Sequence, residues 1–348
     1  MGKSSLIVVL GFSVIVAFLI LKLNANSKEN LSTTVNMFEQ TQARIIANTG
    51  VEIYLEKLYA DTTLINTTSS SQNIFDGSYI VNLSGTLPNV RVTSTATFQG
   101  TNHISVADAL LEPISLPTMP GGFYISSTAV ENAKLTGDMM VNGSNHDTLG
   151  VIKGDGKPAV YGVAVDSEDD KLKILSAISK QQNLVGLLNA TGEIGFPSVE
   201  VSNLGYNWGK IYQNLANAAD TTIIGSIPKG SQLGTLVRPR ITLINADASS
   251  TKSITLSQTT GAGILIINGD VKFEGNFTYQ GIVLCYKNSN LTFQSTGTNL
   301  IVGGLIAAGK FINVSIGGTM DIRYSPDTLI LIKHRLKANG FTILAWYE

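Results

Sequence analysis

Residues 304–310, GLIAAGK, are the closest match in this chain to a motif with known chemistry. They follow the first part of a phosphate-binding loop, in which backbone amides and a lysine hold phosphate groups. Phe311 comes next, where a Ser or Thr hydroxyl would have to hold magnesium. The run also lies inside an apolar, strand-like stretch and not at a strand-to-helix turn. We therefore expect no nucleotide site here.

The three histidines give no metal site that can be read from the sequence. His103, His146 and His334 are far apart in the chain. His146 and Asp147 are adjacent and could form a proton-transfer couple or half of a metal site. An Asp in such a Gly- and Asn-rich segment more commonly bonds nearby backbone amides. We expect a structural turn at this pair.

Residues 166–170, DSEDD, bring several carboxylates together. Carboxylate oxygens bind calcium, but this run lacks the alternating ligands and the glycine of a calcium loop. Acidic side chains are stabilised near the positive end of a helix dipole. We therefore expect the start of a solvated helix.

Acidic residues that lie apart in the sequence of the C-terminal third leave open the interpretation that the chain is an enzyme. Asp270, Glu274, Asp321 and Arg323 lie in a β-rich stretch, and stacked strands could bring some of them together. Glycosidases use paired carboxylates. The alternative function is thus an envelope-anchored β-solenoid carbohydrate-active enzyme or glycan-binding protein. We prefer a non-catalytic protein, with no cofactor and no metal.

Composition favours an exported, turn-rich protein. The chain has 348 residues, of which 34 are Gly and only 14% are charged, and its formal net charge is -1. This balance gives no field that would attract nucleic acid. The single cysteine, Cys285, excludes an internal disulfide and a thiolate metal site. Its apolar surroundings, GIVLCYK, predict a buried side chain.

An apolar run over residues 6–23 is long enough to cross a membrane. A helix rises about 1.5 Å per residue and needs roughly 17–25 apolar residues to span a bilayer. Lys3, Lys22 and Lys28 flank the run and can extend toward the head groups. The predicted anchor residues are Leu6, Ile7, Val8, Val9, Leu10, Phe12, Val14, Ile15, Val16, Phe18, Leu19, Ile20 and Leu21.

A cleavable signal peptide is the competing interpretation of this run. Residues 25–27, Ala-Asn-Ser, could form its cleavage site. The apolar run is longer than a usual signal core, and the helical pattern continues beyond it. We therefore prefer an uncleaved anchor.

The helix is predicted to continue to residue 60. Apolar residues follow one face at helical spacing, and no proline occurs between Met1 and Leu87. A helix of about 55 residues would be roughly 80 Å long. The residues predicted to pack this helix, against partner subunits or a domain, are Leu31, Val35, Phe38, Ile45, Val51, Leu55 and Leu58.

The remainder of the chain is predicted to be mostly β. Alternating runs at 79–83 and 90–98 indicate antiparallel strands, and prolines near residue 118 suggest a boundary. Helices are expected at 168–188 and 208–218. The predicted regions are 1–60, a transmembrane and amphipathic helix; 61–118, a small antiparallel sheet on that helix; and 119–348, a β-rich body.

Short apolar runs between glycines at 261–325 favour a β-solenoid. Gly269, Gly275 and Gly281 recur at intervals of six residues, as turns between stacked rungs would require. An antiparallel β-sandwich is the alternative. The fold class is therefore α+β and mostly β, with a long membrane-embedded helix, a small antiparallel sheet and a C-terminal solenoid-like domain.

The order of motifs resembles that of PilX-type minor pilins and related type IV pilus assembly proteins. The motifs are the apolar helix at 3–23; ARIIANTGVE at 43–52; GDMMVNGSNHDTLG at 137–150, followed by KPAVYG at 157–162; the β-rich run at 261–284; and the closing AWYE at 345–348. The resemblance implies a single-pass protein of the bacterial inner membrane. Its body would lie in the periplasm or on an extracellular filament. Its implied partners are other pilin-like subunits, the pilus assembly machinery and membrane lipid.

The N-terminus departs from the family pattern. Prepilins are cut after a glycine, which would make Gly2 the processing site and Lys3 the first mature residue. The fifth mature position, usually Glu in the family, is then Ile7. The buried carboxylate that would form an ion pair with the N-terminal amine of a neighbouring subunit is therefore missing.

Overall fold

A computed structural model describes residues 2–112, 115–154, 159–188, 192–225, 227–248, 253–336 and 340–348, with side chains described from Val9 onward except at 112 and 340. The chain divides into two compact units. The first comprises Met1–Tyr59, Leu64–Glu112 and Gly340–Glu348, and the second comprises Ala60–Thr63 and Pro113–Asn339.

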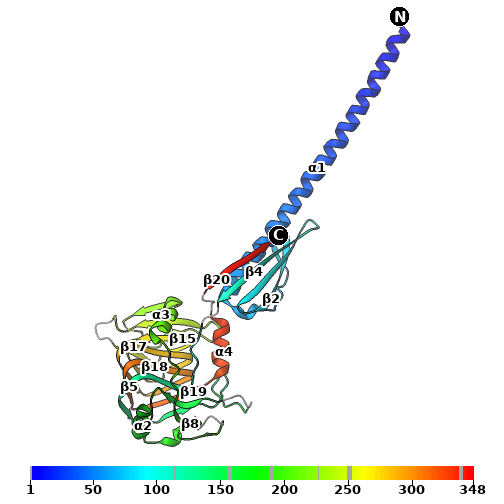
Figure 1. The fold of residues 1–348 in the computed structure, drawn as a ribbon. Helices are drawn as coiled ribbons and strands as arrows, with labels where there is room; N and C mark the ends of the chain where they lie inside the picture. The colour runs from blue at the N-terminus through cyan, green and yellow to red at the C-terminus, as the bar shows by residue number, and fades with distance from the viewer. Residues whose placement is uncertain are drawn as a thin grey trace. The chain divides into compact units, whose positions relative to one another are not determined.

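The first unit is a long helix packed on an antiparallel sheet (Figure 1). The helix is α1 (Gly2–Ala60), and the sheet has the order β1-β2-β3-β4-β20. The strands are β1 (Gln72–Ile74), β2 (Gly77–Thr86), β3 (Asn89–Phe98), β4 (Thr101–Glu112) and β20 (Gly340–Tyr347). Side chains in β2 and β3 alternate between buried and exposed, which confirms the strands predicted at 79–83 and 90–98.

The last strand of the chain belongs to the first unit. β20 pairs antiparallel with β4, with Phe341 opposite Leu111 and Tyr347 opposite Val106. The sequence-derived division had placed these residues with the body, because strand alternation does not identify a strand's partner. Their position in the structure shows that three separate segments build this unit.

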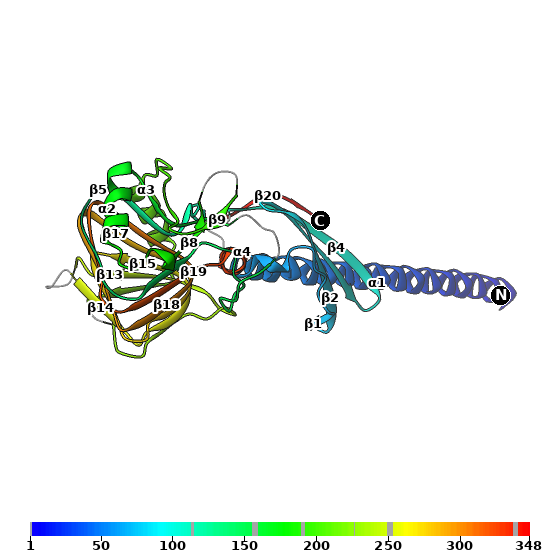
Figure 2. The same cartoon turned by 90° about the horizontal axis from the view of Figure 1, so that it is seen from below.

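The second unit is built mainly from parallel strands (Figure 2). The central order is β11-β13-β15-β17-β18-β19-β6-β8-β9, in which only β8 and β9 are antiparallel. Its strands are β5 (Gly121–Leu135), β6 (Met139–Asn142), β7 (Tyr161–Val165), β8 (Leu184–Leu187), β9 (Ile194–Gly195), β10 (Val199–Val201), β11 (Thr221–Ile224), β12 (Gln232–Leu233), β13 (Arg240–Asn245), β14 (Ser253–Ser257), β15 (Thr260–Asn268), β16 (Asp270–Glu274), β17 (Thr278–Thr296), β18 (Thr298–Ile316) and β19 (Thr319–Tyr324). This parallel pairing differs from that of an antiparallel sandwich.

Apolar cores cover both faces of the parallel strands, as parallel sheets require. Val283 and Cys285 of β17 face the larger core, which also holds Phe273 and Phe293. Ile282 and Leu284 face a second core that includes Trp208 of α3 (Trp208–Asn217) and Ile332 of α4 (Pro326–Arg335). The predicted burial of Cys285 is confirmed, and burial raises the pKa of its thiol.

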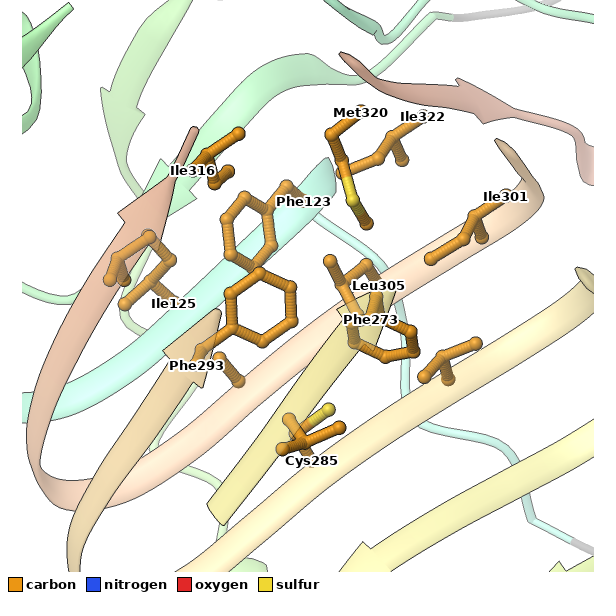
Figure 3. Packing of buried hydrophobic residues seen from close by; sticks show 14 of the residues in the cluster. Phe123, Ile125, Phe273, Cys285, Phe293, Ile301, Leu305, Ile316, Met320 and Ile322 are labelled. Carbon is orange, nitrogen blue, oxygen red and sulfur yellow. The ribbon is translucent and has the colours of Figure 1, made fainter. Parts of the chain in front are cut away.

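The larger core contains a group of aromatic rings (Figure 3). Phe293 lies between Phe123 and Phe273, with ring centroids 5.7 and 5.4 Å away. The three rings come from β5, β16 and the second half of β17. Burying three phenyl side chains stabilises the second unit, called the body from here on, by roughly 1.5–3 kcal/mol each.

A ladder of glycines fixes the close approach of neighbouring rungs. Gly263, Gly281 and Gly303 occupy equivalent positions in β15, β17 and β18 and have φ of 126°, 137° and 138°. A Cβ atom at Gly281 would collide with the carbonyl oxygen of Gly263. Only glycine can occupy this position without strain.

The helices of the body partly follow their predictions. α3 confirms the helix predicted at 208–218. The helix predicted at 168–188 is shorter: α2 (Glu168–Ala177) ends before Ile178, whose backbone is extended, and Leu184 lies in β8. The apolar residues after 178 alternate along a strand. Over so short a run, the sequence alone cannot distinguish a helical spacing from a strand alternation.

Candidate functional site: the N-terminal helix and its supporting sheet

The first half of α1 carries apolar side chains that are exposed from Val9 onward. Phe18, for example, is 72% exposed. The other exposed apolar residues between 9 and 23 are Val9, Leu10, Phe12, Val14, Ile15, Val16, Leu19, Ile20, Leu21 and Leu23. Within the described residues, α1 is the one helix long and apolar enough to cross a membrane. An apolar surface around the whole helix is typical of a segment surrounded by lipid or by other helices.

Several hydroxyl side chains on the helix form hydrogen bonds within it. The Ser13 hydroxyl donates to the carbonyl oxygen of Val9 at 2.8 Å. Thr33 and Thr34 donate in the same way to the carbonyls four residues earlier. A hydroxyl paired in this way can enter an apolar environment at reduced cost. The one serine within the apolar run is therefore compatible with a membrane.

The second half of α1 packs against the sheet through small and branched residues. Ala43, Ile46 and Ala47 are completely buried. At Gly50 the helix approaches the sheet so closely that a Cβ atom would collide with the Ser94 hydroxyl and lie 2.8 Å from the Tyr79 ring. This stripe begins near residue 43 and explains why only the outer half of the helix remains unpacked.

Contacts from the β3–β4 hairpin mark where the sheet ends along the helix. The Phe38 and Phe98 rings meet edge to face at 6.0 Å. The Thr101 hydroxyl donates to the Glu39 carboxylate at 3.1 Å. N-terminal to Phe38, every described large apolar side chain of α1 is exposed.

The C-terminal strand is fastened to both the helix and the sheet. Asn48 of α1 donates to the Glu348 carboxylate at 2.7 Å, and Arg44 lies 3.6 Å from the same group. The indole of Trp346 donates to the Ser105 hydroxyl at 2.9 Å. These contacts hold β20 at the open edge of β4.

The structure separates the predicted helix-packing residues into two sets. Val51, Leu55 and Leu58 are buried in the first unit's own core. The others remain exposed: Leu31, Val35, Phe38 and Ile45. Of the predicted anchor and processing residues, the side chains of Gly2, Lys3, Leu6, Ile7 and Val8 lie outside the described residues.

Sequence reasoning missed the residues that bring the helix closest to the sheet. Ala43, Ile46, Ala47 and Gly50 occupy positions i, i+3, i+4 and i+7, which lie on one face of a helix. A pattern of large apolar residues does not include this stripe, because three of its four members are small. Small residues at helical spacing are the signal that would predict it.

One ion pair of the first unit joins two neighbouring strands of the sheet. Arg91 of β3 forms a paired hydrogen bond with Asp108 of β4, at 2.7 and 2.8 Å. This hydrogen bond lowers the pKa of the Asp108 carboxyl. On the inner face, burial raises the pKa of Tyr79.

The other candidate sites of the sequence have structural roles in the body. Asp147 accepts hydrogen bonds from the backbone amides of Leu149 and Val151, both at 2.8 Å, as the predicted turn requires. Ser167 caps α2, so the acidic run begins a helix. Residues 304–310 lie within β18, away from any strand-to-helix turn.

The separated acids of the C-terminal third pair with basic side chains. Asp270 lies 3.0 Å from Lys287, and Glu274 lies 3.2 Å from Lys272. Asp321 lies 2.6 Å from Arg323. Within the described residues, no group of three His, Cys, Asp or Glu residues could hold a metal ion.

Comparisons with known proteins give structural similarity at a low level only. No family model matches this chain, and no curated protein matches it. Among solved structures, the crystal structure of the competence-associated pilin ComZ from Thermus thermophilus covers 89% of this chain and 97% of its own, with 11% identity and a TM-score of 0.30. A TM-score this low does not establish a shared fold.

Proposed function

We propose that this protein is a membrane-anchored, non-catalytic, pilin-like subunit. Its role would be in type IV pilus assembly, in surface adhesion or in a secretion pseudopilus. The observation that carries the proposal is the division of α1, whose outer half is apolar and unpacked while its inner half is fixed to a sheet. A helix fixed in this way presents a defined apolar surface to lipid and to neighbouring helices.

The proposed location is the bacterial inner membrane, with a single span. The body would lie in the periplasm or on the extracellular filament. The proposed partners are other pilin-like subunits, the assembly machinery and lipid. Exposed Leu31 and Val35 follow the membrane-length segment and would meet partner helices just outside it.

The body is best interpreted as a β-solenoid that serves as a structural head. The parallel register from β13 through β18 and the glycine ladder support this interpretation. The pairing of Asp270, Glu274 and Asp321 with basic side chains favours a non-catalytic role over the alternative of a carbohydrate-active enzyme.

Site-specific photocrosslinking in cells tests the assembly role. A photoreactive phenylalanine analogue is introduced at Leu31 or Val35, and at exposed Leu172 of α2 as the control. We expect the helix positions, and not the control, to capture proteins that carry a similar apolar N-terminal helix, identified by mass spectrometry. If protein in the membrane fraction gives no such product from either helix position, the proposal is wrong.

A further inference from the structure

A pocket in the second unit has the features of a ligand site and has no role in the preceding proposal. It is an open pocket with a volume of about 340 Å³, at the small end of the usual range for small-molecule sites. Its lining includes Ser127 and Thr128 of β5, Asp166 after β7, and Tyr206 and Trp208 at the start of α3. All of these residues belong to the same unit.

Asp166 is held in place by neutral donors. The Tyr124 hydroxyl donates to Oδ1 at 2.7 Å and the Ser126 hydroxyl donates to Oδ2 at 2.6 Å. The backbone amide of Ser127 also donates to this carboxylate. A carboxylate has about four acceptor positions, so at least one remains for a further donor.

No basic side chain among the described residues acts on this carboxylate. Burial raises the pKa of Asp166, and the nearby charge of Asp170 raises it further. Asp166 is also the one carboxylate among the described residues that line the pocket. Calcium binds through six to eight oxygens, and this lining is poor in charged oxygen ligands.

Ser127 provides a second, independent indication of a ligand. The residue is 8% exposed and lines the pocket, and its buried hydroxyl has no hydrogen-bond partner among the described residues. A buried hydroxyl without a partner costs free energy that a bound polar group can recover. A ligand hydroxyl placed in the pocket would supply that partner.

The aromatic side of the pocket is fixed before any ligand arrives. The Trp208 indole donates to the Ser126 hydroxyl at 2.7 Å. The Tyr206 ring meets the Trp208 ring edge to face, with centroids 5.2 Å apart. The Tyr206 hydroxyl accepts a hydrogen bond from the backbone amide of Thr118 at 2.9 Å. Fixed rings lose little conformational entropy on binding.

We propose that this pocket binds a neutral saccharide unit. One sugar hydroxyl donates to the open position of Asp166, and a neighbouring hydroxyl pairs with Ser127. The apolar C–H groups of the ring lie beside Tyr206 and Trp208. A saccharide combines closely spaced hydroxyls with an apolar ring surface, and this lining offers a partner to both. The proposal does not depend on assembly through α1.

Tryptophan fluorescence of the full chain provides the test. The chain has two tryptophans, so Trp346→Phe leaves Trp208 as the remaining indole. The protein is prepared in a detergent without a sugar head group. It is titrated with glucose, galactose, mannose, N-acetylglucosamine and N-acetylgalactosamine. We expect at least one of these sugars to change the emission in a saturable manner with a Kd of roughly millimolar.

Two substitutions connect the signal to the pocket. Ser127→Ala should weaken binding roughly tenfold while leaving the unfolding midpoint nearly unchanged, because the hydroxyl has no partner to lose. Asp166→Asn should weaken it at least as much. Ser94→Ala is the matched control, since Ser94 is another buried serine without a hydroxyl partner, in the first unit.

Three results would overturn the proposal. The first is the absence of a saturable change with any sugar of the panel up to roughly 50 mM. The second is equal binding by the Ser127→Ala and Ser94→Ala variants. The third is the same emission change produced by calcium chloride alone. If Asp166→Asn does not fold, the Ser127→Ala comparison decides.

Discussion

Arg44 of α1 and Glu348 at the end of β20 lie 3.6 Å apart, and Asn48 donates a hydrogen bond to the same carboxylate. Helix α1 and the last residues of the chain therefore belong to one unit. Most of the residues that lie between them in the sequence form the second unit. This arrangement makes the last strand a structural requirement for the unit that carries the membrane-length helix.

Replacing Trp346 with Ala should loosen the first unit more than removing the terminal charge. The substitution deletes a large half-buried side chain and its hydrogen bond to Ser105, at an expected cost of about 2–4 kcal/mol. Glu348→Gln should cost under about 1 kcal/mol, because Arg44 and Glu348 are well exposed. Hydrogen exchange of the β4 amides measures both variants. Equal protection in the two would contradict this ranking.

Gly50→Ala should push α1 away from its sheet. The added Cβ atom would collide with Ser94 and crowd Tyr79, so we expect a loss of about 1–3 kcal/mol from the unfolding free energy of the first unit. Gly11→Ala is the matched control, since nothing lies within 4 Å of a Cβ atom at that position. There the better helix propensity of Ala should leave stability unchanged or slightly higher. Chemical denaturation followed by circular dichroism distinguishes the two variants. An unchanged unfolding free energy in Gly50→Ala would show that α1 and the sheet are not in tight contact at this position.

Gly281→Ala should disrupt the body at the centre of its glycine ladder. Gly281 combines a φ of 137° with a Cβ position blocked by the Gly263 carbonyl, so the expected cost exceeds about 3 kcal/mol. Gly275→Ala is the control, because its φ is 52° with no atom within 4 Å, and it should cost only about 1–2 kcal/mol. Limited proteolysis of the body compares them. Similar resistance in the two variants would argue against the ladder as the tightest contact.

Asp166 should give the body a stability that falls as pH rises. Its pKa is raised in the folded state, mainly by burial, so the folded protein binds the proton more strongly than the unfolded chain. Stability is therefore highest below the ordinary carboxyl pKa and decreases as pH rises through the raised value. Asp166→Asn should remove this decrease, which unfolding midpoints measured from about pH 4 upward would reveal.

Asp108 provides the control with the opposite sign. The hydrogen bond from Arg91 lowers its pKa, so its contribution is present above the ordinary carboxyl pKa and is lost as pH falls through the lowered value. Asp108→Asn should therefore matter least in acid. A pH response of Asp166→Asn that matched that of Asp108→Asn would contradict the environment described for the pocket.

Ile15→Asp should release the protein from the membrane. A carboxylate near the middle of a membrane helix costs about 2.5–3.5 kcal/mol, and Ile15 is exposed within the apolar half of α1. Ile15→Leu is the control and should remain in the membrane fraction after alkaline washing. Retention of Ile15→Asp in that fraction would mean that the segment is not the anchor.

Local patterns predicted those parts of the fold whose periodicity was clear. The long helix, the strands at 79–83 and 90–98, and the helix at 208–218 each have one dominant spacing. The burial of Cys285 followed from its apolar neighbours. In these segments the local sequence and the final packing agree.

Contacts between segments far apart in the chain could not be predicted from the sequence. The pairing of β20 with β4 joins residues near 345 to residues near 107, and no local pattern specifies such a partner. Gly263, Gly281 and Gly303 stack across rungs. Predicting that they do so would require knowledge of the strand register. The pocket at Asp166 likewise combines β5, the end of β7 and the start of α3.

The 300 residues between Asn48 and Glu348 have a consequence for biosynthesis. A ribosome adding about 5–20 residues per second completes β20 roughly 15–60 s after α1 has been made. Throughout that interval β4 has an open edge, and open strand edges invite pairing with other chains. The residues of β20 must therefore be synthesised before the anchored unit can close, and until then the edge of β4 is exposed to other chains.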